Sequence, residues 1–468
     1  MSTHRIEHDL LGEREIPAGA YWGIHTLRAL ENFPITGKTI GSYPDLVRAL
    51  ALVKQAAAQA NRDLGELDDE RARAIIAACQ EIARGALHEQ FVVDVIQGGA
   101  GKSTNMNANE VICNRALELL DAPRGDYARL HPINHVNMAQ STNDVYPTAL
   151  CVAACFAIRE LLDAMAELRL AFSGKAHEFR DILKLGRTQL QDAVPMTLGQ
   201  EFSTYAVMLG EDESRLGEAI SLIREINLGA TAIGTGINTD IRYAQLAVRH
   251  LAEITGLPLV SAENLIEATQ DTGAFVQLSG VLKRIACKLS KTCNDLRLLS
   301  SGPQAGFNEI HLPPRAAGSS IMPGKVNPII PEVVNQIAFE VIGNDVTISM
   351  ASEAGQLQLN AFEPIIAHSL FRSIQYLAAG CRTLSRNCVT GITANTSLLA
   401  ERVRTSAGLA TALNPYIGYE NATRVAQEAL RTGRGVAELV LEMGLMDQES
   451  LDEALCAETL TAPRNTMA

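Results

Sequence analysis

Four polar side chains that could bind a small anion lie within one short stretch of the chain. Residues 318–331 read Gly-Ser-Ser-Ile-Met-Pro-Gly-Lys-Val-Asn-Pro-Ile-Ile-Pro, which contains Ser319, Ser320, Lys325 and Asn327. A helix cannot run through so many Gly and Pro residues, so we expect a loop. Flexible glycines let backbone N–H groups point at a ligand, while the lysine adds positive charge and the asparagine an amide. Composition alone leaves a Pro/Gly connector as an equally good interpretation.

A second candidate ligand loop spans residues 97–107, Gln-Gly-Gly-Ala-Gly-Lys-Ser-Thr-Asn-Met-Asn. Its glycines allow a ligand to approach the backbone closely, next to the polar side chains of Lys102, Ser103 and Thr104. The order Gly-x-Gly-Lys-Ser invites a P-loop interpretation. A Walker sequence, however, needs four residues between its two glycines, and only two separate Gly98 from Gly101. We therefore reject a nucleotide site.

Two further polar segments precede long helical patterns. Ser141, Thr142 and Asn143 stand just before one of them, where such residues usually cap the helix N-terminus. The same free N–H groups that need caps also bind anions, so capping and ligand binding are both open. Residues 186–192, Gly-Arg-Thr-Gln-Leu-Gln-Asp, come before another helical pattern and are interpreted first as a connector.

Taken in order, these segments resemble the motifs of the aspartase/fumarase superfamily, whose members eliminate a group beta to a carboxylate and release fumarate. Residues 318–328 match its signature loop nearly letter for letter, and Gln140-Ser-Thr-Asn-Asp144 matches a second motif. The resemblance covers about residues 5–465 and is closest to the aspartases. It implies that Ser319 is the catalytic base and that Lys325 acts with it in catalysis.

The resemblance also implies a set of substrate-binding residues. Hydroxyl and amide groups would hold the carboxylates of a dicarboxylate substrate, and others would orient its amino end. A glutamate that pairs with a histidine in fumarases has its counterpart in Glu332, behind the site. The substrate-binding residues are Lys102, Ser103, Thr104, Ser141, Thr142, Asn143, Thr188, Gln189, Ser320 and Asn327.

Several positions bear on which reaction of the superfamily the resemblance implies. Lys102 stands where a threonine normally contacts substrate, and a lysine there would either bind a carboxylate or repel an ammonium leaving group. Gln304 replaces an arginine. Gln189 stands where fumarases have a histidine, and an amide can neither accept a proton nor become cationic. The last change favours an aspartase over a fumarase.

We therefore expect the reversible anti-elimination of ammonia from L-aspartate, giving fumarate through an aci-carboxylate. Such a dianion needs several donors, and the Ser319 hydroxyl needs N–H groups and a cation to ionise. No cofactor is expected to be required, although the resemblance allows a divalent activator such as Mg²⁺. His4 to His8 and His131 to His135 have a metal-ligand spacing, but neither pair has the context of an HExxH helix. They are interpreted as solvated or capping histidines.

The elements that position these segments are predicted to be helices. Aromatic residues make up only 4% of the 468-residue chain, and apolar residues recur every three or four positions in several long runs. We expect a mainly all-α, three-domain aspartase/fumarase-like chain with a central bundle: an N-terminal domain over 1–142, the bundle over 143–395 and a small C-terminal domain over 396–468. The helical patterns span about 43–63, 68–84, 146–179, 196–226, 273–299 and 331–359.

Composition restricts the partners. The net charge is −13 without a basic run, which argues against nucleic acid, and no apolar window predicts a membrane span or a signal sequence. The nine cysteines form no CxxC and indicate a reduced, cytoplasmic protein. The expected partners are a small dicarboxylate and other copies of the chain. The resemblance implies a homotetramer with a tetrameric helical core and active sites shared by three subunits.

Other functions remain open at this stage. The chain could be a lyase for a different 2-substituted succinate, including malate as in a fumarase, and the lysine at position 102 and Gln304 favour such a change. It could also be a catalytically silent structural relative, as lens crystallins are in this superfamily. The intact Ser319, Lys325 and Asn327 argue against the silent alternative.

Overall fold

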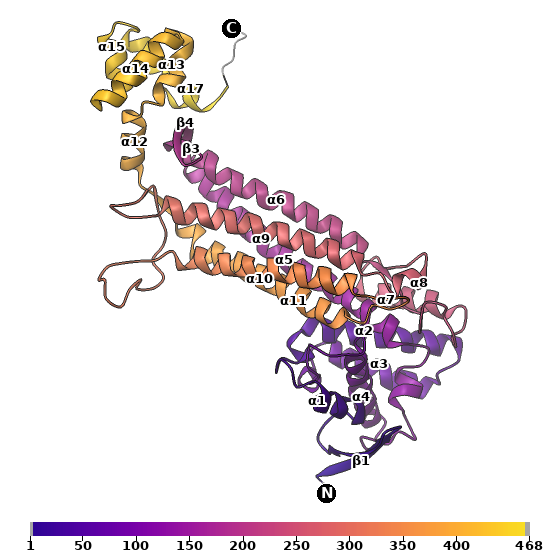
Figure 1. Ribbon diagram of the computed structural model, residues 1–468. Coiled ribbons are helices and arrows are strands. Elements are labelled where there is room, and N and C mark those ends of the chain that lie inside the picture. Colours follow the sequence, from indigo (N-terminus) through magenta and orange to yellow (C-terminus); the bar gives the residue numbers. More distant parts are fainter. Residues whose placement is uncertain (1–2, 464–468) are drawn as a thin grey trace. The chain divides into compact units, whose positions relative to one another are not determined.

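The computed structural model describes residues 3–463, and helices make up most of it, as Figure 1 shows. The prediction of a mainly all-α fold is confirmed. The chain divides into two compact units. Unit 1 comprises residues 1–162, 214–286 and 339–377, and unit 2 comprises 163–213, 287–338 and 378–468. The three predicted domain boundaries stay a prediction.

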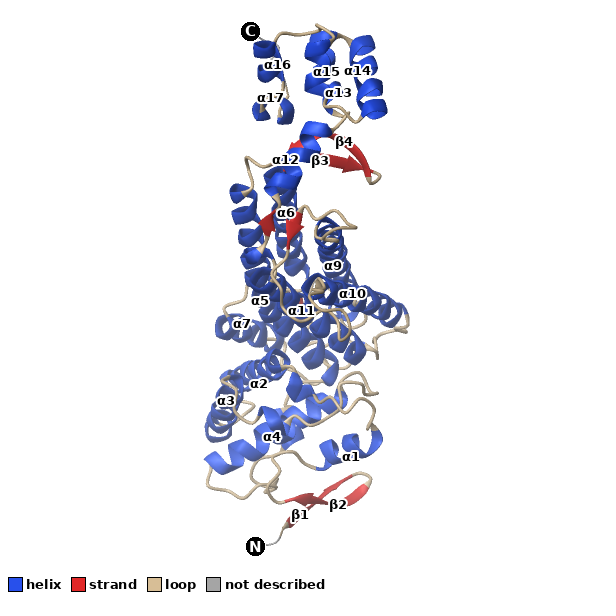
Figure 2. Cartoon of the chain, turned by 90° about the vertical axis from the view of Figure 1, so that its left-hand side faces the viewer, coloured by secondary structure: helices blue, strands red, loops and turns tan. Residues whose placement is uncertain are grey.

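Five long helices contribute residues to both units, and they form the predicted bundle (Figure 2). The longest, α5, has 37 residues, or about 55 Å at 1.5 Å per residue. Within unit 1, Ser279 of α9 donates to Asp345 of α10 at 2.8 Å, and Asn344 donates to Ser373 of α11 at 3.0 Å. The five helices are α5 (Thr142–Glu178), α6 (Leu198–Leu222), α9 (Gly273–Leu299), α10 (Ile329–Glu353) and α11 (Glu363–Asn387).

The rest of unit 1 is an N-terminal helical layer with a short hairpin. Strands β1 and β2 pair antiparallel, with His4 opposite Pro17, and α2 packs against α3 and α7. The elements are β1 (His4–Asp9), β2 (Gly12–Pro17), α1 (Ile24–Asn32), α2 (Pro44–Leu64), α3 (Asp69–Ala83), α4 (Lys102–Leu119), β5 (Glu225–Ile226), α7 (Tyr243–Thr255), β6 (Val260–Ser261) and α8 (Leu265–Ala268).

Unit 2 adds the β3–β4 hairpin, a short antiparallel pair of β7 and β8, and a separate helical cluster with its own apolar core. That core gathers Leu413, Val425, Val436 and Leu451, together with Leu185 of β3. The elements are β3 (Leu183–Thr188), β4 (Gln191–Thr197), β7 (Ile310–His311), β8 (Thr393–Ala394), α12 (Thr396–Thr405), α13 (Leu409–Ile417), α14 (Tyr419–Thr432), α15 (Val436–Glu442), α16 (Gln448–Ala454) and α17 (Ala457–Thr461).

Some helix bounds differ from the predicted ranges, for local reasons. The predicted 196–226 helix begins only at Leu198, because β4 continues to Thr197. The predicted 331–359 helix ends at Glu353, where the Asn360 amide donates to the carbonyls of Ala351 and Ser352 and caps the last turn. Helix α11 lies outside the predicted ranges.

The state of the cysteines and the character of the helices concern two of the sequence-based predictions. All nine cysteines are free thiols, and seven of them are buried. Among residues 3–463, no helix combines the length and the apolar character that crossing a membrane requires.

Candidate active site

The signature stretch is a loop closed at its base, as predicted. The Gly318 N–H donates to the Lys325 carbonyl at 2.7 Å, and the Asn327 amide donates to the Gly318 carbonyl at 2.7 Å. A Cβ at position 318 would lie 2.6 Å from the Lys325 carbonyl oxygen, so only glycine fits this closure. The loop ends at Ile329, where α10 begins. Asn327 therefore both closes the loop and lies at the start of the helix.

The Ser319 hydroxyl oxygen accepts two backbone hydrogen bonds from the loop that carries it. The donors are the N–H groups of Ile321, at 3.2 Å, and Met322, at 3.0 Å. Hydrogen bonds to an oxygen stabilise its ionised form, so this turn favours the alkoxide of a serine base. Ser319 is half-buried, whereas Ser320 and the apolar tip residue Ile321 are exposed.

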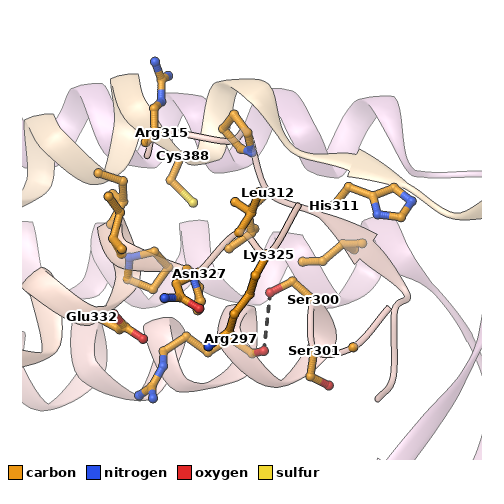
Figure 3. Close-up of a pocket in the computed structure, with 18 of the residues that line it drawn as sticks. Arg297, Ser300, Ser301, His311, Leu312, Arg315, Lys325, Asn327, Glu332 and Cys388 are labelled. Carbon is orange, nitrogen blue, oxygen red and sulfur yellow. Dashed lines mark hydrogen bonds between the residues drawn. The ribbon is translucent and has the colours of Figure 1, made fainter. Parts of the chain in front are cut away.

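Lys325, Asn327 and Glu332 line one cavity of about 730 Å³ within unit 2 (Figure 3). Two arginines that the sequence patterns did not single out, Arg297 and Arg315, line it as well. Three cations against one carboxylate suit an anionic ligand. Neither Ser319 nor Ser320 is among the lining residues.

In unit 1, the Lys102 loop leads into α4. Gly101 adopts φ +86°, and a Cβ there would meet the Tyr146 ring at 2.5 Å, so this close approach requires glycine. Lys102 is exposed and Ser103 half-buried at the first turn of α4. Thr104 is fully buried, and its hydroxyl donates to Gln97 Oε1 at 3.1 Å. The structure thus turns Thr104 to the protein interior.

Ser141, Thr142 and Asn143 lie at the N-terminus of α5 and are half-buried. The Ser141 hydroxyl accepts from the Asn143 N–H at 3.2 Å, and the Ser141 N–H donates to Asp144 at 2.9 Å. This reciprocal pair is a helix cap, so the capping interpretation is confirmed. Thr142 Oγ1 accepts from the Asn105 amide at 3.1 Å, which brings the first turns of α4 and α5 together.

A proline fixes the position of Asn143. Pro147 lies inside α5 and has no N–H, so it leaves the Asn143 carbonyl without its helical partner. The Asn227 amide fills that place with a hydrogen bond of 3.0 Å. The Asn143 amide itself donates to the Ala232 carbonyl at 2.7 Å. Asn143 is thereby held from two sides by residues 227–232.

A buried polar network supports these helix ends from behind. Asn137 Oδ1 accepts three hydrogen bonds, from Lys54 Nζ at 2.9 Å, Asn105 at 3.1 Å and Asn109 at 3.0 Å. Burial lowers the pKa of Lys54 to about 7. The sequence patterns did not single out this network, although a lysine within the apolar run of α2 was a visible signal.

Asp144 links the cap to the glycine-rich segment after α6. Its carboxylate accepts from the N–H groups of Gly229, at 2.9 Å, and Thr231, at 3.2 Å, in addition to Ser141. Burial raises the pKa of Asp144 to about 6, although these three N–H groups and the Lys54 charge oppose that rise. The carboxylate thus orders two segments around Ser141.

Thr188 and Gln189 lie at the exposed tip of the β3–β4 hairpin in unit 2. Thr188 pairs with Gln191, so Gln189 and Leu190 form a two-residue turn. The structure therefore gathers the predicted residues into three clusters: one at the starts of α4 and α5, one in the loop before α10, and one at the hairpin tip. Their roles stay predictions.

The histidine pair at 131 and 135 has a structural role. His131 Nδ1 accepts from the N–H groups of Ile133, at 3.0 Å, and Asn134, at 3.2 Å, so the capping interpretation of His131 is confirmed. Within residues 3–463, no group of three or more His, Cys, Asp or Glu side chains is arranged to hold a metal ion.

Comparison with known proteins decides the family. A family model described as Lyase matches residues 12–343, and one described as Fumarase C C-terminus matches residues 409–462. The chain belongs to the lyase family. It is 60% identical to an aspartate ammonia-lyase of Pseudomonas aeruginosa over 99% of this chain and 98% of the relative. It is 54% identical to an aspartate ammonia-lyase of Escherichia coli K12, over 98% and 96%.

Solved structures agree with this family. A fumarate lyase:delta crystallin of Brucella melitensis, bound to cobalt, superposes with a TM-score of 0.96 at 53% identity, covering 98% of this chain and 100% of that one. A class II fumarase of Schistosoma mansoni has a TM-score of 0.91 at 35% identity, covering 98% of each chain. The predicted superfamily and the predicted carbon–nitrogen lyase class of this lyase are confirmed.

Proposed function

We propose that this lyase catalyses the reversible anti-elimination of ammonia from L-aspartate to give fumarate. The observation that carries the proposal is that the Ser319 hydroxyl oxygen accepts hydrogen bonds from two N–H groups of its own loop, at 3.2 and 3.0 Å. A serine that removes a carbon-bound proton must act as an alkoxide, and this turn supplies donors for one. The relatives named aspartate ammonia-lyase support the same substrate.

The carboxylate that becomes the aci-carboxylate would be held by cations and helix ends. Lys325 and Asn327 supply a charge and an amide from the signature loop, and Ser141 and Thr142 supply hydroxyls at the start of α5. The dipole of α5 adds partial positive charge at that helix end. Donors that strengthen as negative charge develops lower the barrier rather than only binding substrate.

Amide and hydroxyl groups would orient the amino end for the anti geometry. We assign this task to Asn143, Thr188 and Gln189, with Ser103 and Ser320 at the edges of the site. Gln189 cannot take up a proton, so ammonia leaves without that side chain acting as an acid. Glu332 lines the Lys325 cavity and would tune its charge. Lys102 adds a contact to a substrate carboxylate.

The proposed assembly is a homotetramer in which three subunits contribute to each site. Phe339, Gly343, Val346 and Met350 step by four, three and four along α10, and all four are exposed. This is the spacing of a helix–helix seam, with a glycine that permits close approach. We place the protein in the cytoplasm, which the free thiols support.

We propose that no cofactor is required, with a divalent cation such as Mg²⁺ as an optional activator. The proposed chemistry is a proton removal and a C–N cleavage, which the serine, the lysine and the oriented amides supply. Adding and chelating Mg²⁺ during the assay would measure any activation directly.

A spectroscopic assay of the purified chain tests the function. Fumarate absorbs in the ultraviolet, so turnover of aspartate, malate and other 2-substituted succinates is measured in one format. We expect aspartate to have the highest kcat/KM, by at least about 100-fold, because a site built for one polar leaving group rejects others strongly.

A second candidate is a lyase for another 2-substituted succinate, favoured by the exposed Lys102. A higher kcat/KM for any other succinate would establish that candidate, and no fumarate from any of them would indicate a silent relative.

A further inference from the structure

The turn that carries Gln189 has a backbone conformation that its residues do not favour. Gln189 has φ +54° and Leu190 has φ +64°, both in the left-handed region. A two-residue hairpin turn with both central residues at positive φ normally uses Asn-Gly or Gly-Gly. A residue with a Cβ is strained there, and such a turn persists only where the surrounding structure holds it. The β3–β4 tip therefore needs an anchor.

The anchor that the structure offers is Glu309, which is only 1% exposed. One carboxylate oxygen lies 2.5 Å from Arg187 Nη2 and 3.3 Å from Arg402 Nη1, and the other lies 2.8 Å from Lys184 Nζ. Arg187 and Lys184 are both on β3, and Arg187 directly precedes Thr188. One buried carboxylate thus holds two points of the strand that leads to the tip.

Glu309 is itself fixed by its backbone. Its N–H donates to the Leu299 carbonyl at the end of α9, at 2.8 Å, and its carbonyl accepts from the Asn395 N–H at 2.9 Å. The Arg187 guanidinium also stacks over the Phe307 ring at 4.2 Å, and Arg402 donates to the Phe307 carbonyl at 2.7 Å. The anchor is therefore joined to the end of α9 and to Asn395 at the start of α12.

Charge balance makes the anchor sensitive to substitution. Burial raises the pKa of Glu309, but the Arg187 hydrogen bond and the Lys184 charge outweigh it, and the pKa lies below its ordinary value. Glu309 is thus ionised near neutral pH. Removing the Glu309 charge leaves the surrounding cations without the buried negative charge that balances them. This costs more stability than the loss of an ion pair at the surface.

We propose that Glu309 is a positioning residue for the elimination: it holds β3 through Arg187 and Lys184, so that the strained turn presents Thr188 and Gln189 to the amino end of the substrate. This inference rests on the proposed function for the roles of Thr188 and Gln189. It assigns to Glu309 no contact with substrate.

The matched pair of variants is Glu309→Gln and Glu201→Gln. Glu201 is the other carboxylate on Lys184, at 2.6 Å, but among the described residues it forms no ion pair with Arg187. We expect Glu309→Gln to lower kcat/KM for aspartate about 100-fold, and Glu201→Gln to change it less than threefold. If Glu309 acts through the tip, Thr188→Ala combined with Glu309→Gln is little worse than Thr188→Ala alone. If the double variant instead shows the product of the two single losses in kcat/KM, the proposal is overturned.

A rescue variant tests the strain directly. Leu190 is 64% exposed, and glycine adopts positive φ without penalty, so Leu190→Gly relaxes the turn. We expect Leu190→Gly alone to change kcat/KM less than threefold. Added to Glu309→Gln, the Leu190→Gly substitution should raise kcat/KM at least fivefold above that of Glu309→Gln alone. No restoration would overturn the claim that the anchor acts on the turn.

Amide hydrogen exchange separates this inference from the proposed function. We expect exchange across residues 187–191 to rise at least tenfold in Glu309→Gln and to stay unchanged in Glu201→Gln, whatever the substrate. Unchanged exchange in Glu309→Gln would overturn the anchor even if aspartate is the substrate. A wild-type chain that makes no fumarate from aspartate would overturn the function alone.

A second variant serves if Glu309→Gln does not fold. Arg187→Lys keeps the positive charge but shortens the side chain that reaches Glu309. The same hydrogen-exchange measurement and the same combination with Thr188→Ala then test the proposal.

Discussion

Two parts of this lyase hold the predicted catalytic and substrate-binding groups in contrasting ways. In unit 1, Ser141, Thr142 and Asn143 lie on the first turn of a 37-residue helix and are tied to buried groups such as Asp144. In unit 2, Ser319 lies in a loop that is closed by the Gly318 and Lys325 backbone and ends in an exposed apolar tip. A buried network supports the first part from behind, whereas hydrogen bonds within the loop itself, including that of the Asn327 side chain, support the second.

The contrast suits the two roles that the proposed function gives these parts, substrate binding at the helix ends and proton removal in the loop. Groups on helix ends with satisfied buried partners lose little entropy when substrate binds, so they suit the recognition of a fixed carboxylate. A loop that contains Gly318 and Gly324 can close over substrate and exclude water at the reacting carbon. The proposed base, Ser319, takes both N–H donors from its own loop, so a movement of the loop would carry the donors with the hydroxyl.

The largest effect is expected from the loop. Ser319→Ala should lower kcat for fumarate formation about 1,000-fold, because the base is lost, and should change the unfolding free energy by less than about 0.5 kcal/mol. Ultraviolet absorbance of fumarate and chemical denaturation measure the two quantities. Ser320→Ala is the matched control and should retain kcat within about tenfold. A fully active Ser319→Ala enzyme would show that the base is not Ser319, and the contrast between the two parts would no longer hold.

The next effect concerns pH and the helix-built part. Glu363 of α11 is buried beside a cavity of about 240 Å³ that Thr148 of α5 also lines, and burial raises its pKa from 4.5 to about 8. The folded chain then binds a proton that the unfolded chain has lost, so wild-type stability falls as pH rises from about 4.5 to 8. Glu363→Gln removes this term and should be more stable than wild type at pH 8.5 by on the order of 4 kcal/mol.

Denaturation of Glu363→Gln and wild type at pH 5 and pH 8.5 checks this outcome. At pH 5 the wild-type carboxyl is protonated in the folded state, so the two chains should differ far less there than at pH 8.5. An equal difference at both values would mean that Glu363 does not titrate within the fold. Burial of Glu363 would then contribute nothing to the pH dependence of the unfolding free energy in the helix-built part.

A somewhat smaller effect should follow from the buried network. Asn137→Leu removes the acceptor of Lys54, Asn105 and Asn109, so it leaves buried donors unpaired. We expect a loss of about 3 kcal/mol in the unfolding free energy. Adding Lys54→Met should recover part of it, since no buried ammonium then lacks a partner. A neutral Asn137→Leu would show that the helix ends hold their positions without this support.

The smallest effect is expected at the exposed edge of unit 1. Lys102→Thr should raise KM for aspartate about tenfold with little change in kcat, because one charge-assisted contact to a carboxylate is lost. Lys102→Arg keeps the charge and should stay within about threefold. A gain in aspartate activity in Lys102→Thr would instead identify Lys102 as the residue that diverts the enzyme to another succinate.

Much of this could be predicted from the chain itself, and the failures have particular causes. The helices near 43–63 and 273–299 follow from apolar residues at steps of three and four. The loop at 318–328 follows from its Gly and Pro residues. Thr104, however, looks like any other hydroxyl in its motif, and only packing shows that it donates to Gln97 inside the protein. Helix bounds at 198 and 353 depend on a strand pairing and on the distant Asn360 cap.

By itself, the sequence determined which residues can do chemistry and which backbone segments can bend, because residue type sets pKa, hydrogen-bonding capacity and φ preference. Only the tertiary structure decided which groups those segments meet. Asn227 beside the carbonyl that Pro147 leaves free, three donors on Asn137 and three cations on Glu309 all join residues far apart in the chain. The reason is that hydrogen bonds and charges act over a few ångströms in space, whereas sequence patterns report only neighbours along the chain.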